Sequence, residues 1–277
     1  MIIDAHVHVW PDHIAAAVVA ARPSGLTAMY DGTLAGITKT MLDAGVDKAM
    51  TLGVAAKAST VARTNEFIGS VPRDRFIPFG TVHPELSIEE NLRHLHENDI
   101  RGVKLHPLFQ TLSLSDPRVV ELVGALADDG IVIITHVGAG GDAEAGERGA
   151  PRHVRHLVDL YPNLKLIACH FGGYHLLDEA EEQLVGSNAF LETSWPPTVA
   201  AVDKDRVRAI VAAHGADRIV FGSDWPMANP AAEIAAIRDL DLGSDRETGI
   251  LGENLARLLG IEPAGTEAPE RKDVHRG

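Results

Sequence analysis

Short apolar runs alternate with segments of helical spacing along most of this chain. Eight of the runs have the length and the apolar character of buried strands. They cover residues 1–9, 47–55, 75–84, 100–107, 130–138, 164–173, 189–195 and 218–226. Because eight strand–helix units follow one another in 277 residues, the pattern predicts a parallel sheet closed into a single-domain α/β barrel, the (β/α)8 or TIM-barrel fold.

An open, doubly wound sheet is the main alternative to the barrel. That fold usually has a glycine-rich phosphate-binding loop after its first strand, and residues 6–13, HVHVWPDH, do not resemble one. We expect the barrel to cover residues 1–262. Residues 263–277 are polar and contain several Pro and Gly, which predicts a weakly ordered tail. The Gly- and Ala-rich segment 138–150 follows the fifth strand, where a mobile active-site loop would lie.

Helix start and stop signals support the alternation. Asp116 and Pro117 can cap and begin a helix, and Gly130 suits the position just after its end. Ser87 and Glu90 have the spacing of a capping box. These signals predict helices between the third and fourth and between the fourth and fifth strands.

The first predicted strand has polar side chains on one of its two faces. Side chains alternate along a strand. The face expected to pack against the helices consists of Ile3, Ala5, Val7 and Val9. Asp4, His6 and His8 would then point into the barrel. A buried parallel strand is normally apolar on both faces, so these polar side chains need partners.

Three later strands also end in polar residues, namely His136, His170 and Asp224. Active sites of these barrels lie at the carboxyl ends of the strands, so we expect these residues to meet His6 and His8 at one mouth. A single histidine at a strand end is more often a hydrogen-bonded core residue than a ligand. Four strands that end in such groups are harder to explain without a site, and two imidazoles at strand spacing can chelate one ion.

Composition excludes several classes of protein. The chain has 25 basic and 39 acidic residues, a formal charge of −14, which disfavours binding to nucleic acids or to anionic membranes. Its one cysteine, Cys169, excludes a disulfide framework and a cysteine-rich zinc site. No secretion signal and no membrane-spanning run is evident, so we expect a cytoplasmic protein whose partner is a small-molecule substrate.

Several motifs, taken together, resemble the amidohydrolase superfamily. The resemblance is greatest to the amidohydrolase-related branch that includes aminocarboxymuconate-semialdehyde decarboxylase. The matching stretches are DAHVH (4–8), GVKLHP (102–107), TH (135–136), CHFGG (169–173), FGSDWP (221–226) and ENLARLLG (253–260). They extend over nearly the whole chain and are specific to the superfamily, but not to a substrate. Dimers are common among the proteins that this one resembles, so a homodimer is one expectation.

The resemblance implies one divalent metal at the barrel mouth, usually Zn²⁺, with Mn²⁺ as an alternative. Its implied ligands are His6, His8, His136 and Asp224, and His170 would stand beside a metal-bound water. Imidazole and carboxylate ligands suit zinc, and a catalytic zinc keeps one position open. Asp224 could also accept the proton of the water as general base, and His170 could orient the water or polarise a substrate oxygen.

Lys104 lies on the fourth predicted strand and has two functional interpretations. In some members of the superfamily a lysine of this strand is carboxylated and bridges two metals, in which case His170 would bind the second metal. Alternatively, Lys104 is a plain ammonium that binds a substrate carboxylate or pairs with buried carboxylates. The branch generally uses one metal, so we favour the plain ammonium.

Three further residues are candidates for the substrate pocket. His106 points the same way as Lys104, and Trp195 and Trp225 each follow a strand end and precede a proline. His106 could equally bond a loop, and each tryptophan could simply anchor one. Alternation turns Cys169 toward the helices, where we expect a small apolar core residue.

Three functions compete at this point. The first is a metal-dependent hydrolase that acts on an ester, lactone or amide of a small carboxylate-bearing molecule. The second is a metal-dependent, non-oxidative decarboxylase or hydratase of a small unsaturated or aromatic acid. The third is a binding protein with a vestigial metal site, which the intact set of ligands disfavours. Aromatic residues make up only 5% of the chain, which slightly favours hydrolysis.

Overall fold

The computed structural model describes residues 1–21, 26–140 and 143–262. Its eight strands pair in parallel and in chain order, so the predicted barrel is confirmed. The strands are β1 (Ile3–Val7), β2 (Lys48–Leu52), β3 (Phe76–Thr81), β4 (Gly102–Leu105), β5 (Val132–Thr135), β6 (Leu166–Ala168), β7 (Phe190–Glu192) and β8 (Ile219–Val220). The backbone N–H of Ala5 donates to Phe221 O at 2.9 Å, and that of His8 donates to Trp225 O at 2.8 Å. These bonds join the end of β8 to β1.

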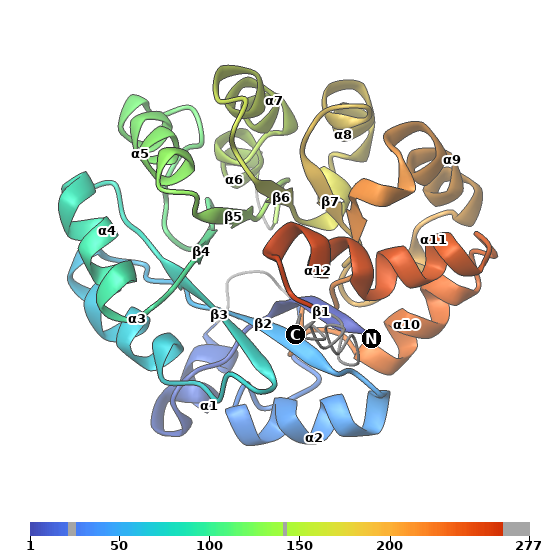
Figure 1. Cartoon of the computed structure of the whole chain (residues 1–277), viewed down its shortest axis with the longest axis horizontal. Helices are drawn as coiled ribbons and strands as arrows, with labels where there is room; N and C mark the ends of the chain where they lie inside the picture. The colour runs from blue at the N-terminus through green and yellow to red at the C-terminus, as the bar shows by residue number, and fades with distance from the viewer. Residues whose placement is uncertain (22–25, 141–142, 263–277) are drawn as a thin grey trace, which may run out of the picture.

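Helices follow the strands and surround them, as Figure 1 shows. They are α1 (Asp12–Ala20), α2 (Leu34–Ala44), α3 (Val61–Gly69), α4 (Ile88–Glu97), α5 (Pro117–Asp128), α6 (Ala143–Arg148), α7 (Pro151–Leu160), α8 (Leu177–Leu184), α9 (Lys204–His214), α10 (Pro230–Arg238), α11 (Ser244–Thr248) and α12 (Asn254–Leu259). The expected mobile loop 138–150 therefore contains a short helix, α6. The expected tail, 263–277, lies outside the described residues.

Local sequence signals begin two of these helices as predicted. Asp116 accepts a hydrogen bond from Arg118 N, and Pro117 is the first residue of α5. Ser87 and Glu90 form both bonds of a capping box at the start of α4. Each cap satisfies backbone N–H groups that have no partner within the helix.

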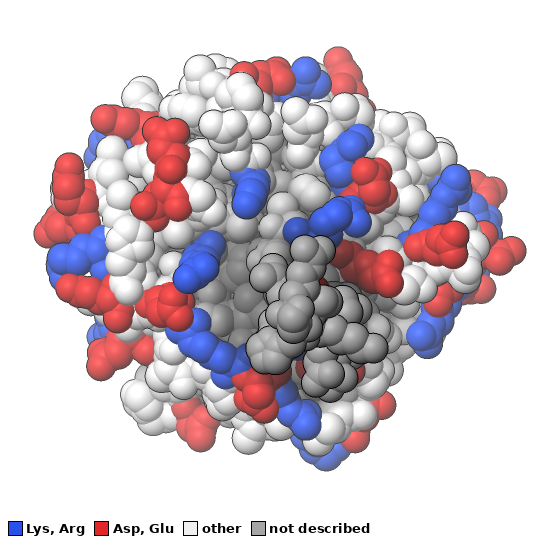
Figure 2. Space-filling model, in the orientation of Figure 1, with Lys and Arg blue, Asp and Glu red and all other residues white. Residues whose placement is uncertain are grey.

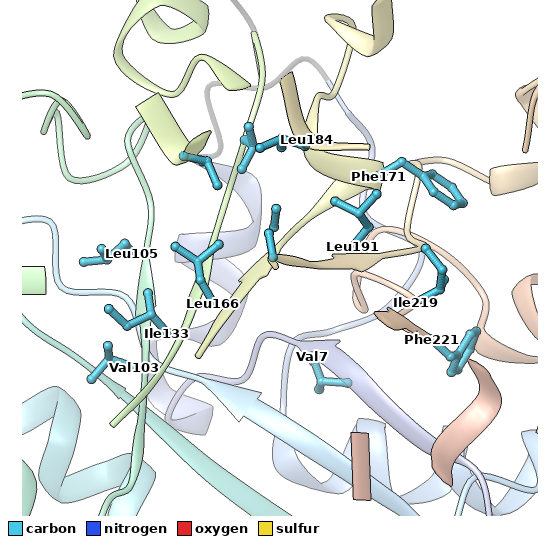
Figure 3. Packing of buried hydrophobic residues seen from close by; sticks show 14 of the residues in the cluster. Val7, Val103, Leu105, Ile133, Leu166, Phe171, Leu184, Leu191, Ile219 and Phe221 are labelled. Atoms are coloured by element: carbon cyan, nitrogen blue, oxygen red, sulfur yellow. The ribbon is translucent and has the colours of Figure 1, made fainter. Parts of the chain in front are cut away.

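The core has two layers. The outer layer lies between strands and helices, and Figure 3 shows part of it, with Val103 and Leu105 of β4 and Leu191 of β7 among its members. The inner layer fills the barrel with alternate residues of the strands, which include Ile3, Met50, Ile134, Ile167 and Val220. Leu255 and Ala256 of α12 pack onto this inner cluster. The polar residues at the mouth of the barrel thus lie above an apolar inner core.

The first strand departs from simple alternation. Between Asp4 and Val7 it advances by three residues while β2 advances by two, which is the signature of a bulge. Ile3 and Ala5 consequently belong to the inner cluster, although we expected both to face the helices. The extra residue changes which side chains share a face. His6 still reaches the barrel mouth, where it lines a cavity.

Charged residues cover the outer surface without a sign preference on the face seen in Figure 2. There Lys and Arg side chains are mixed with Asp and Glu over the surrounding helices. Among the described residues, no helix is long and apolar enough to cross a membrane.

Candidate metal centre

Three of the four predicted metal ligands meet at the carboxyl end of the barrel. His6 Nε2 lies 3.2 Å from His8 Nε2 and 3.3 Å from Asp224 Oδ1. His8 Nε2 lies 3.6 Å from the same carboxylate oxygen. One ligand atom from each residue falls within 4.8 Å of the other two, and all three residues are buried. This spacing suits donors that share one small cation.

The backbone at the strand ends aims these side chains. Asp224 has a φ of 59° and His170 a φ of 61°, both in the left-handed region that non-glycine residues rarely adopt. Such conformations concentrate at functional sites, where the surrounding structure enforces them. The turn at Asp224 lies in the segment after β8, and the turn at His170 follows Cys169.

The turn at His170 also corrects the expected orientation of Cys169. Cys169 belongs to the inner cluster and does not face the helices. Strict alternation along a strand would allow only one of the consecutive residues Cys169 and His170 to point inward. The left-handed turn releases His170 from that alternation, so both side chains reach the interior. Burial raises the pKa of the Cys169 thiol.

His136 lies beside His170 rather than within the group of three ligands. His136 Nδ1 is 3.0 Å from His170 Nε2, and the His136 ring stacks on that of His106 with centroids 4.6 Å apart. The Nε2 atom of His136 is buried and has no hydrogen-bond partner among the described residues. Its role as a fourth ligand stays a prediction.

Burial and neighbouring charges keep the imidazoles of His136 and His170 neutral. Burial lowers the pKa of His170 to about 3, and the neighbouring His136 adds to the effect. Burial also holds the pKa of His136 well below its usual value, and the charge of Lys104 acts in the same direction. Neutral imidazole is the form that binds metals.

Asp4 connects the two segments that carry His6 and Asp224. Its Oδ1 accepts hydrogen bonds from Ser223 N at 2.9 Å and His6 N at 3.0 Å, and its Oδ2 accepts from Ser223 Oγ at 2.6 Å. Burial nevertheless raises the pKa of Asp4 to about 7, because the loss of hydration outweighs these donors. The carboxyl group ties β1 to the segment after β8, directly before Asp224.

Lys104 lies inside the barrel, with its side chain fully buried. Its Nζ is 3.2 Å from His6 Nε2 and donates to Cys169 Sγ at 3.0 Å. A second group of metal-type side chains, His6, Cys169 and Glu192, also lies close together, but it shares His6 with the first. An unmodified Lys104 would place a positive charge in contact with two members of that group, His6 and Cys169.

Glu192 and Ser194 belong to the site although the sequence did not single them out. Glu192 Oε2 lies 3.0 Å from His6 Nδ1 and accepts a hydrogen bond from Ser194 Oγ at 2.9 Å. Ser194 O lies 3.1 Å from His170 Nδ1. One signal could have identified Glu192: it is an acidic residue within an apolar strand that a barrel buries on both faces.

A cavity opens above these groups. The described residues that line it are His6, His8, Leu26, His106, Leu108, Phe109, His136, Gly140, His170, Tyr174, Pro196, Asp224 and Met227. Of the four predicted substrate-binding residues, only His106 is among them. Lys104 lies below the imidazoles, and Trp225 is buried against Tyr30 with ring centroids 5.8 Å apart. Trp195 packs edge-on against Tyr174, with centroids 5.1 Å apart, and lines a neighbouring cavity.

The donor set fits a divalent metal. Neutral imidazoles and a carboxylate are the ligands that Zn²⁺ and Mn²⁺ accept. The buried His136 Nε2 without a partner is a further observation in favour, because a buried polar atom usually has one. His6, His8 and Asp224 would hold the ion.

Comparisons with known proteins agree with this fold and site. The family model described as amidohydrolase matches residues 3–261, so the chain belongs to the amidohydrolase family. We conclude that the protein is an enzyme of the amidohydrolase superfamily. No curated protein sequence matches the chain significantly.

Solved structures with the same fold include both decarboxylases and a hydrolase. The 5-carboxyvanillate decarboxylase of Sphingomonas paucimobilis is 17% identical, with a TM-score of 0.71 over 94% of this chain and 99% of that one. The dihydroxybenzoic acid decarboxylase of Polaromonas sp. JS666, solved with manganese and 2-nitroresorcinol, is 17% identical, with a TM-score of 0.70 over 95% and 98%. A probable 2-pyrone-4,6-dicarboxylic acid hydrolase of Acinetobacter baumannii is 15% identical, with a TM-score of 0.67 over 94% and 99%. At these identities the likeness establishes the fold alone.

Proposed function

We propose that this protein is a metal-dependent hydrolase that cleaves an ester, lactone or amide of a small molecule. The observation that carries the proposal is the convergence of His6 Nε2, His8 Nε2 and Asp224 Oδ1 at one point of the cavity wall. A divalent ion held there would supply Lewis acidity toward water and a carbonyl oxygen.

The side chains around that point have separate roles in the proposal. Asp224 acts as general base, because its carboxylate faces both the ligand imidazoles and the cavity. His170 lines the cavity as a neutral imidazole. Its Nε2 contacts His136 Nδ1 at 3.0 Å, so it would orient the substrate or the water by hydrogen bonding only once that contact opens. Leu108, Phe109 and Met227 give the cavity an apolar wall that excludes bulk water.

The proposed enzyme uses one metal and keeps Lys104 as an unmodified ammonium. Two contacts support this: Nζ lies 3.2 Å from His6 Nε2 and 3.0 Å from Cys169 Sγ. A carboxylated lysine would add three heavy atoms at a position that these neighbours already fill. The described cavity lining contains no Lys or Arg, so a substrate carboxylate would have imidazoles and the metal as its partners.

A metal-dependent decarboxylase or hydratase is the second candidate. The apolar and aromatic part of the cavity wall favours it, because Phe109 and Tyr174 could flank a planar acid. The low aromatic content of the whole chain does not weigh against this candidate, because two aromatic side chains line the cavity itself. The decarboxylases among proteins of the same fold give this candidate further support.

A substrate screen distinguishes the two candidates. Protein loaded with Zn²⁺ or Mn²⁺ is offered a panel of lactones, esters, amides and aromatic carboxylates, and both acid release and CO2 release are measured. We expect acid release from a lactone or ester. CO2 release from an aromatic acid, without any hydrolysis, would favour the decarboxylase. The double variant His6→Ala, His8→Ala should lose metal and turnover together, and turnover by that variant would contradict both candidates.

A further inference from the structure

Glu192 is surrounded by hydrogen-bond donors at the end of β7. Its Oε1 accepts from the backbone N–H of Ser194, and its Oε2 accepts from Ser194 Oγ at 2.9 Å. The same Oε2 lies 3.4 Å from His170 N and 3.0 Å from His6 Nδ1. The residue is fully buried, so water does not compete for these bonds.

The carboxylate fixes the position of the proton on His6. A carboxylate accepts hydrogen bonds and does not donate them, so the contact at 3.0 Å requires a proton on His6 Nδ1. On the other side of the ring, Lys104 Nζ lies 3.2 Å from His6 Nε2, and an ammonium only donates. Glu192 and Lys104, the two nearer charged neighbours, therefore select the same tautomer, in which Nε2 carries a lone pair. Asp224 Oδ1 lies slightly farther from that Nε2, at 3.3 Å, and would by itself favour a proton there. In this tautomer Nε2 is the ring atom that lies beside His8 and Asp224.

The same segment orders a second pair of imidazoles. Ser194 O lies 3.1 Å from His170 Nδ1, and a carbonyl oxygen only accepts, so His170 Nδ1 carries the proton. His170 Nε2 then accepts from His136 Nδ1 at 3.0 Å. The consequence is an unprotonated His136 Nε2, which is the buried ring nitrogen that has no hydrogen-bond partner among the described residues.

We propose that Glu192 is a positioning residue that, together with Ser194, locks His6 and His136 in the tautomer with an unprotonated Nε2. Metal ligands of this kind depend on such outer partners, which orient the ring and raise its basicity. The effect on metal binding rests on the proposed function. The tautomers themselves do not, because the contacts with Glu192, Lys104 and Ser194 that favour them are present in the metal-free protein.

The decisive variant is Glu192→Gln. We expect the side-chain oxygen of glutamine to face the backbone N–H of Ser194, which is closer to the carboxylate than that of His170, so the NH2 group faces His6 Nδ1 and forces that atom to accept. The proton of the ring then moves to Nε2, where it blocks metal binding. A matched control is Glu233→Gln, because Glu233 is also a buried glutamate that accepts from a backbone N–H, that of Val199, at 2.8 Å, and it is no part of the candidate site.

Two measurements test the proposal. The first is the ¹⁵N–¹H correlation spectrum of the imidazoles in metal-free protein, with His6 assigned from the signal lost in His6→Gln. We expect an Nδ1–H tautomer in the wild type and an Nε2–H tautomer in Glu192→Gln. The second is calorimetric titration with Zn²⁺ and with Mn²⁺. We expect Glu192→Gln to bind about 10- to 100-fold more weakly than the wild type and Glu233→Gln to bind as the wild type does.

An Nε2–H tautomer of His6 in the wild type would overturn the proposal without any variant, even if Glu192→Gln failed to fold. The proposal would also fail if Glu192→Gln kept the wild-type tautomer and metal affinity. It would fail likewise if Glu233→Gln lost as much metal affinity as Glu192→Gln. A tautomer change in Glu192→Gln, with no metal binding by the wild type, would support the positioning role and contradict the proposed function.

Discussion

Nε2 of His6 lies 3.3 Å from Oδ1 of Asp224, so the first and the eighth strand place an imidazole and a carboxylate against the same point. The closed barrel makes this possible, because backbone hydrogen bonds from β1 reach the residues that follow β8. The candidate metal centre depends on this contact, and its first test is a change to Asp224.

Asp224→Asn should separate metal binding from catalysis. The amide keeps an oxygen that can coordinate a metal but cannot accept a proton as a carboxylate does. We expect kcat to fall by about 100-fold or more, while metal is still bound with lower affinity. Asp239→Asn is a control, since Asp239 is paired with Lys204 on the surface. An Asp224→Asn variant with wild-type kcat would remove Asp224 from the role of general base.

Lys104 should carry no carboxyl group. Native mass spectrometry of the purified protein is expected to give the mass of the unmodified chain plus a single metal ion. The physical reason is that Lys104 Nζ is already in contact with His6 and Cys169. A mass increase equal to one CO2, together with two metals per chain, would show that the binuclear interpretation was the right one.

Cys169 should be inert as a thiol in the folded protein. It is fully buried, burial raises its pKa, and only the thiolate reacts readily. Because it is the single cysteine, a disulfide reagent reports on it alone. We expect no reaction under native conditions and one equivalent after denaturation. Rapid labelling of the native protein would be inconsistent with the placement of Cys169 in the inner cluster.

The raised pKa of Asp4 predicts a pH dependence of stability. The pKa of this carboxyl is about 7 in the folded protein, whereas its ordinary value, which we assign to the unfolded chain, is 3.8. Between these values the unfolded chain has lost the proton while the folded protein retains it, so the contribution of Asp4 to stability decreases as pH rises through this window. Below the window the carboxyl is protonated in both states, and above it the contribution stays constant.

Asp4→Asn isolates this effect, because its amide oxygen can accept from His6 N and Ser223 N while its NH2 donates to Ser223 Oγ. With a chelator present, we compare the free energy of unfolding of the wild type with that of this variant. The difference, wild type minus variant, should fall by about 1 kcal/mol or more from about pH 4 to about pH 7. Chemical denaturation at the two pH values measures it. A difference that is constant or increases with pH would rule out the raised pKa.

Much of the fold was predictable because it depends on local patterns. Strand–helix alternation predicts the barrel, and the caps at Asp116 and Ser87 begin their helices as their side chains require. The convergence of His6, His8 and Asp224 also followed from a simple rule, namely that the carboxyl ends of parallel strands meet at one edge.

The rest could not be predicted, because it depends on departures from regular geometry. The orientations of Ala5 and Cys169 depend on one extra residue in β1 and on a left-handed turn at His170. The role of Glu192 depends on contacts across strands, since its partner His6 lies at the other end of the sequence. Periodicity within a single strand contains neither kind of information.

The central claim is that His6, His8 and Asp224 hold a catalytic divalent metal. Its most direct test is the metal content of protein purified without chelator, measured by elemental analysis beside the His6→Ala, His8→Ala double variant. We expect close to one Zn²⁺ or Mn²⁺ per wild-type chain and none in the variant. A wild-type chain without bound metal that nevertheless turns over substrate, or a variant that retains the full metal content, would contradict the account.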